Sequence, residues 1–162
     1  MKSTAFSFRT YRLQLLFIFL TTFFLTSCAL KPIYSEYNFT KLDKKYADLE
    51  KLGNGNVLIY NGANVFHKVD NTASLNIWIN GRALGQIKAN EYVIINLREG
   101  NYEFKALHLD LFTMRSKHDV DITKNTKVIK IKPNLTSNKL EITNELPRNF
   151  HKFNHVQSQS ID

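Results

Sequence analysis

The chain of 162 residues is poor in cysteine and glycine, and it lacks a long apolar run. Its one cysteine, Cys28, permits no disulfide within the chain and no zinc site built from several thiolates. Among only six glycines, no phosphate-cradling loop stands out. The main apolar stretch, residues 13–25, is shorter than the about 20 residues that a membrane-spanning helix needs.

The first 27 residues are organised like a bacterial export signal. Lys2, Arg9 and Arg12 supply a positive N-terminus, and no acidic residue occurs before Glu36. A positive end followed by an apolar core of about 7–15 residues is typical of a signal peptide. The alternative is an uncleaved membrane anchor, which the shortness of the apolar stretch disfavours.

The end of this leader, Leu25-Thr26-Ser27-Cys28, resembles a bacterial lipobox. The resemblance implies that the Cys28 thiol receives a diacylglycerol and that the leader is cut before this residue. Two or more acyl chains hold a protein stably on a membrane. Ala29 follows the cysteine, as in lipoproteins that bacteria with two membranes send to the outer membrane. We therefore predict a lipid-anchored envelope protein, facing the periplasm from the outer membrane in such bacteria.

Beyond the leader (residues 1–27), the pattern predicts a tether over residues 28–55, a domain over 56–146 and a mobile tail over 147–162. Apolar residues recur at helical spacing in the tether: Phe39, Leu42, Tyr46, Leu49 and Leu52. They predict one short helix. Its apolar stripe either packs on the domain or meets a partner or the bilayer.

From Asn56 onward the apolar residues alternate with a period of two. About seven or eight short strands joined by turns result, which predicts an all-β fold, an antiparallel β-sandwich. Asn80-Gly81 is the strongest hairpin signal, because both turn positions need a positive φ. The apolar alternation changes phase after Ala106, which predicts a bulge or crossover near Ala106-Leu107.

The stretch Ile77 to Ile87, with its Asn-Gly-Arg turn and Gly85, resembles a pattern that recurs in exported bacterial proteins. The later turn around Gly100 looks like the second turn of the same pattern. Together they are similar to a family of small bacterial lipoproteins akin to PEGA domains, over roughly residues 57–142. The resemblance implies a compact β-sandwich and an exported location, and it carries over no catalytic residue. Gly81, Gly85 and Gly100 have structural roles in turns or close strand approach.

Trp78 is the candidate centre of a binding site. Alternation along its strand points it away from Ile77 and Ile79. It either lies on an exposed aromatic face, flanked by Tyr60 or Tyr92, or packs between layers. The exposed alternative predicts a module that binds a glycan or a peptide.

The sequence predicts no catalytic residue, no metal and no cofactor. No serine lies in a nucleophile elbow, and acylation consumes the one thiol. His108, Asp110 and His118 suggest a metal-dependent enzyme only as a lesser alternative, because their spacing matches no zinc signature.

The net charge is +8, and three of the basic residues lie in the leader. The remaining excess is modest and spread along strands, so we predict no nucleic-acid partner. The predicted partners are membrane lipid, through acylated Cys28, and an envelope protein or glycan. The function predicted from sequence is thus binding or scaffolding by a lipid-anchored β-sandwich.

Overall fold

A computed structural model describes residues 14, 30–40, 49–63, 73–110, 112–134 and 136–156. Within these ranges the chain forms strands and two short 3-10 helices, η2 (Leu49–Lys51) and η4 (Phe150–Lys152). The strands are β1 (Asn56–Asn61), β2 (Leu75–Ile79), β3 (Arg82–Ile87), β4 (Glu91–Asn96), β5 (Gly100–Leu109), β6 (Thr113–Ile122), β7 (Val128–Asn134), β8 (Ser137–Ile142) and β9 (Asn154–His155).

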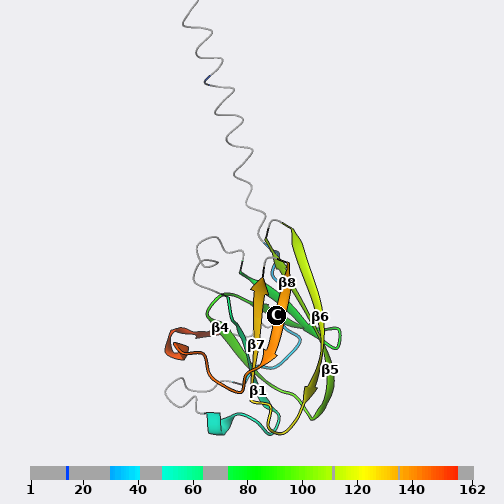
Figure 1. The fold of residues 1–162 in the computed structure, drawn as a ribbon, viewed down its shortest axis with the longest axis vertical. Coiled ribbons are helices and arrows are strands. Elements are labelled where there is room, and N and C mark those ends of the chain that lie inside the picture. The colour runs from blue at the N-terminus through cyan, green and yellow to red at the C-terminus, as the bar shows by residue number, and fades with distance from the viewer. Residues whose placement is uncertain are drawn as a thin grey trace, which may run out of the picture.

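The strands form two facing sheets, so the prediction of an all-β sandwich is confirmed (Figure 1). One sheet has the order β8-β7-β1-β4-β9, and the other has the order β3-β2-β5-β6. Most neighbours are antiparallel, as predicted. The first sheet is mixed, however, because β1 pairs in parallel with β7, and β4 pairs in parallel with β9.

The main core lies between the sheets, where alternate residues of each strand point inward. A second cluster lies on the outer face of the first sheet and includes Leu58, Tyr60, Tyr92, Ile94, Val128 and Phe153. β1 and β4 are therefore buried on both faces. This double burial explains why Val57-Leu58-Ile59-Tyr60 is continuously apolar instead of alternating with polar residues.

The segment after β8 covers that outer face, which corrects the prediction of a mobile tail from residue 147. The Phe153 ring packs edge-on against Tyr60, at 5.6 Å between centroids. The Phe150 ring lies 4.8 Å from that of Tyr92. β9 then adds to the edge of β4, and the Val156 N–H donates to the carbonyl of Tyr92 at 2.9 Å. Residues 157–162 of the predicted tail lie outside the described residues.

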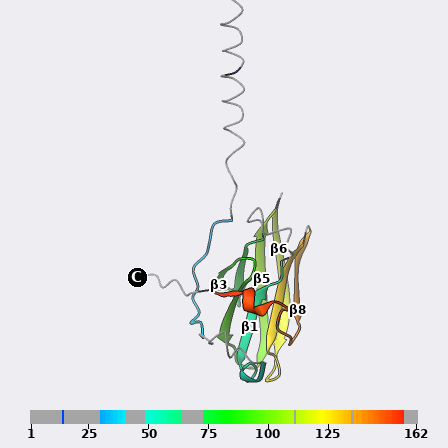
Figure 2. The same cartoon turned by 90° about the vertical axis from the view of Figure 1, so that its left-hand side faces the viewer.

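The segment 30–40 is attached to the sandwich, although the sequence predicted a tether there. It runs along one side of the molecule (Figure 2). The Glu36 N–H donates to the carbonyl of Ala83 in β3, and the Thr40 N–H donates to the carbonyl of Ile94 in β4. The segment therefore joins the edges of both sheets. Of the helix predicted after Phe39, the described residues show only the single turn η2; Leu42 and Tyr46 lie outside the described residues.

The predicted bulge near Ala106-Leu107 is wrong. β5 pairs with β6 in one unbroken register from Gly100 to Leu109. Ala106 and His108 stay on the inner face, so Leu107 and Leu109 point outward. The phase change in the sequence marks apolar residues on the exposed face of a regular strand.

Candidate functional site

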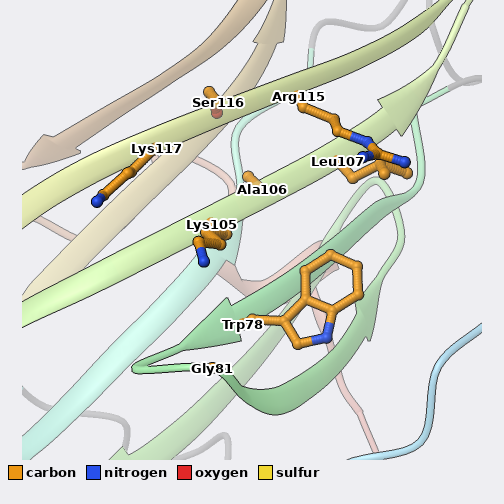
Figure 3. A pocket seen from close by; sticks show the side chains of 8 residues that line it. All are labelled: Trp78, Gly81, Lys105, Ala106, Leu107, Arg115, Ser116 and Lys117. Carbon is orange, nitrogen blue, oxygen red and sulfur yellow. The ribbon is translucent and has the colours of Figure 1, made fainter.

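A hollow of about 670 Å³ lies on the outer face of the β3-β2-β5-β6 sheet. It is lined by Trp78, Gly81, Lys105, Ala106, Leu107, Arg115, Ser116 and Lys117 (Figure 3). The lining joins one aromatic ring and one leucine with three basic side chains, and it contains no acidic residue. We call it the Trp78 hollow.

Strand register brings these residues together. Trp78 on β2 lies opposite Lys105 on β5, and Lys105 lies opposite Lys117 on β6. Two residues further along β5, on the same face of the sheet, Leu107 lies opposite Arg115. Cross-strand partners on one face have Cβ atoms about 4.5–5.5 Å apart, so side chains from three strands meet there.

A break in the β2–β3 register shapes the Trp78 end of the hollow. The pairing shifts between Ile77 and Trp78, opposite Gly85, whose φ is 111°. This confirms the structural role predicted for Gly85. The adjoining turn is also confirmed, since Asn80 and Gly81 have φ values of 49° and 80°. A Cβ on Gly81 would meet no atom within 4 Å, which leaves this side of the hollow open.

Charge is unevenly distributed along β5 and β6. Glu103 lies two residues before Lys105 on β5, and it forms ion pairs with Lys105 at 2.8 Å and with Lys117 at 2.5 Å. Hydrogen bonds from Lys105 and then Lys117 lower the pKa of Glu103, and the same carboxylate raises the pKa of Lys117. One carboxylate is thus shared by two lysines, which leaves the local charge positive.

Arg115 differs from the two lysines. In the described part of the chain it forms no ion pair. Figure 3 shows its side chain reaching from β6 over Leu107 on β5. A guanidinium presents a planar set of donors that matches carboxylate and phosphate oxygens. The lining of the Trp78 hollow therefore includes both an available cation and a half-buried indole.

The N-terminal segment borders the same face of the sheet. The Asn76 side-chain amide donates to the Lys31 carbonyl at 2.8 Å, and Gln86 Nε2 donates to Asn76 Oδ1 at 3.0 Å. Asn76 is buried by this cover and lies opposite Leu107 on β5. The Trp78 hollow is therefore the open part of a face whose other part is covered.

The structure separates Trp78 from the two tyrosines predicted to flank it, so that prediction of one aromatic face is wrong. Tyr60 and Tyr92 are cross-strand partners on the other sheet, on its covered outer face. Both are buried, and burial raises the pKa of each hydroxyl. Trp78 alone of the three lines the Trp78 hollow.

The alternative metal cluster does not form. His108 is buried, and its Nδ1 lies 2.7 Å from Asn138 Oδ1. His118 is opposite Phe104, four residues along β5 from His108, or about 13 Å. Within the described ranges no group of three His, Cys, Asp or Glu side chains could hold a metal ion. Asp110 lies beyond the end of β5.

The sequence identified Trp78 but missed Lys105, Arg115 and Lys117. These side chains come together because β5 pairs with β6 in an unbroken register. The predicted bulge in β5 would have interrupted that register. A signal was available, because both cross-strand pairs are centred on residue 111: Lys105 with Lys117, and Leu107 with Arg115. A hairpin turn placed at that residue predicts both pairs.

Cys28 and the rest of the lipobox, Leu25, Thr26 and Ser27, lie outside the described residues. No helix in the described ranges is long and apolar enough to cross a membrane. Gly100, predicted at a turn, begins β5 with a φ of 148°. Comparison with protein-family models, with curated proteins and with solved structures found no match to this chain.

Proposed function

We propose that the protein is an exported, lipid-anchored bacterial envelope lipoprotein whose β-sandwich binds an anionic glycan in the Trp78 hollow. The lipobox ending at Cys28 supports the anchor, and Ala29 after it supports placement in the outer membrane of bacteria that have one. The role proposed for the domain is binding and not catalysis. The likeness to PEGA-type lipoprotein domains belongs to this proposal, because it rests on the sequence pattern alone.

The observation that carries the binding proposal is the composition of the Trp78 hollow. An indole offers a flat apolar surface for a ring, and cations beside it attract negative charge. Binding sites commonly combine such an apolar surface with a few placed polar groups. Arg115 and Trp78, which both line the hollow, suit a sugar ring that carries a phosphate or carboxylate. An uncharged glycan would leave the Arg115 guanidinium without an anionic partner.

Fluorescence titration tests the Trp78 hollow. Trp78 is the one tryptophan in the chain, so its emission reports directly on this site. Purified full-length protein in detergent micelles is titrated with N-acetylglucosamine 1-phosphate and, in parallel, with uncharged N-acetylglucosamine. We expect a saturable change with the phosphorylated sugar and a much weaker response to the neutral one.

Arg115→Gln is the decisive variant for the same titration, and Lys124→Gln is its matched control. Lys124 is exposed in the turn between β6 and β7, at the other end of β6 from Arg115. Arg115→Gln is expected to weaken binding at least about tenfold, the loss of one charge-assisted hydrogen bond. Equal responses to both sugars, or equal loss in both variants, would contradict the proposed anionic ligand class, and no response to either sugar would favour a scaffolding role.

Cell fractionation tests the anchor separately. The parent chain is expected in the membrane fraction without its leader, because a diacylated cysteine is retained by lipid. Cys28→Ala is expected to keep its leader and to lose lipid labelling. If both forms keep the leader and remain in the membrane equally, the anchoring account fails.

A further inference from the structure

We infer that the tip of the β5–β6 hairpin inserts into the lipid surface next to the anchor and thereby holds the sandwich in one orientation. This inference rests on the proposed acylation of Cys28. The tip carries Phe112, which is 72% exposed although it is a large apolar side chain. An exposed aromatic at the end of a hairpin is suited to the boundary between headgroups and acyl chains.

The path of the N-terminal segment places the anchor near this tip. Gln86 Nε2 donates to the Leu30 carbonyl at 3.3 Å, and Asn76 Nδ2 donates to the Lys31 carbonyl. Asn76 lies opposite both Gln86 and Leu107, so residues 30 and 31 lie beside the row of the sheet that contains Leu107.

The segment also has a defined direction along the sheet. The Glu36 N–H donates to the Ala83 carbonyl, and the Ala83 N–H donates to the Glu36 carboxylate. Ala83 lies opposite Trp78, which in turn lies opposite Lys105, so these three residues form one row across the sheet. Residue numbers on β5 rise toward the hairpin tip, whereas those of the segment fall in that direction. The chain therefore approaches the tip as it is followed back toward Cys28.

Chain length limits how far the anchor can lie from that row. Cys28 lies two positions before Leu30 in the sequence, and an extended chain spans about 3.3–3.6 Å per residue. An acylated Cys28 thus lies within about 7 Å of Leu30. The hairpin continues beyond the Leu107 row through Leu109 to Phe112, roughly 7–13 Å further at strand spacing. The tip therefore reaches into the lipid surface that holds the anchor.

Basic side chains near this end suit an anionic surface. Lys31 is exposed, and Arg115 lies just below the tip. The β7–β8 hairpin ends beside the β5–β6 hairpin, since Asn138 Nδ2 donates to the Met114 carbonyl at 3.4 Å (Figure 1). It contributes Lys132, whose cross-strand partner Lys139 forms an ion pair with Glu141. Basic groups at a membrane surface are attracted to anionic lipids.

A fluorescent label beside Phe112 tests this orientation. Acylation occupies the sulfur of Cys28, so Thr113→Cys supplies one free thiol in the mature protein. The full lipoprotein carries an environment-sensitive dye at this position, in vesicles of phosphatidylethanolamine and phosphatidylglycerol with a lipid-borne quencher. Asn125→Cys, in the exposed turn at the opposite end of β6, is the matched control.

We expect the dye at position 113 to be blue-shifted and quenched severalfold more than the dye at position 125. Adding Phe112→Asp to the Thr113→Cys variant is expected to remove most of that difference while the protein stays on the vesicles. Equal quenching at both positions in vesicle-bound protein would overturn the orientation and leave the anchor intact. Protein that fails to float with the vesicles would overturn the proposed anchor, and this inference with it.

Discussion

Replacing Asn138 with alanine tests how the two sheets are held together. Asn138 lies on β8 and is only 2% exposed. Its side-chain nitrogen donates to the carbonyls of Ala106 at 3.1 Å and Met114 at 3.4 Å, both on the opposite sheet. Because the amide nitrogen faces carbonyls, Oδ1 accepts a hydrogen bond from the His108 Nδ1–H, 2.7 Å away. This buried side chain therefore bonds β8 to both β5 and β6.

The expected cost follows from these three contacts. A neutral hydrogen bond contributes about 0.5–1.5 kcal/mol, and a buried polar group deprived of its partner costs about 1–3 kcal/mol. The 3.4 Å bond is long and contributes least. Asn138→Ala is therefore expected to lower the free energy of unfolding by about 2–4 kcal/mol, a large share of the about 5–15 kcal/mol typical of a domain.

Urea denaturation followed by the fluorescence of Trp78 measures this change. Asn125→Ala, at an exposed turn, is the matched control and should cost less than about 0.5 kcal/mol. The double variant Asn138→Ala with His108→Ala should lose less than the sum of the single variants, because the two side chains contact each other. A loss below about 1 kcal/mol for Asn138→Ala, or strict additivity, would show that these buried hydrogen bonds do not hold the two sheets together.

Four further substitutions test three separate features. Tyr92→Phe is expected to leave the free energy of unfolding unchanged or slightly higher, since the buried hydroxyl has no hydrogen-bond partner in the described part of the chain. Tyr37→Phe is the comparison, because it loses a 3.1 Å hydrogen bond to the Ile79 carbonyl, and it should cost about 0.5–1.5 kcal/mol by thermal denaturation. Gly85→Ala should cost about 1–3 kcal/mol, because φ is 111° there, and an unchanged melting temperature would contradict this strain. The lysine ion pairs lower the pKa of Glu103 in the folded state, so its stabilising effect is present above the ordinary value of 4.5 and is lost as pH falls through the lowered value. Glu103→Gln should accordingly flatten the dependence of stability on acid pH, and an unaltered curve would show that the pairs have no effect in solution.

Local patterns in the sequence predict most of the strands and turns of this sandwich. A tight hairpin turn requires a positive φ at two adjacent residues, which Asn80 and Gly81 both have. This turn can therefore be predicted from two neighbouring residues, without contacts between distant parts of the chain. Alternation likewise located β2, because one face of that strand packs against the core, and the hairpin turn then located β3.

The covering segments could not be predicted in this way, because they depend on contacts between distant parts of the chain. Phe150 and Phe153 lie in a polar, aperiodic stretch, and their role appears only where they meet Tyr92 and Tyr60. The continuous apolar runs of β1 and β4 did hold a hint, since a strand buried on both faces requires a second cover. The basic residues of the Trp78 hollow likewise depend on register across three strands, which periodicity alone does not define.

Mass spectrometry of the N-terminal peptide from membrane-extracted protein shows whether Cys28 is lipidated. We predict a chain that begins at Cys28 and carries a diacylglycerol on the sulfur, with or without a further acyl group on the new amine. A chain that still begins at Met1, with an unmodified thiol at residue 28, would rule out the lipid anchor.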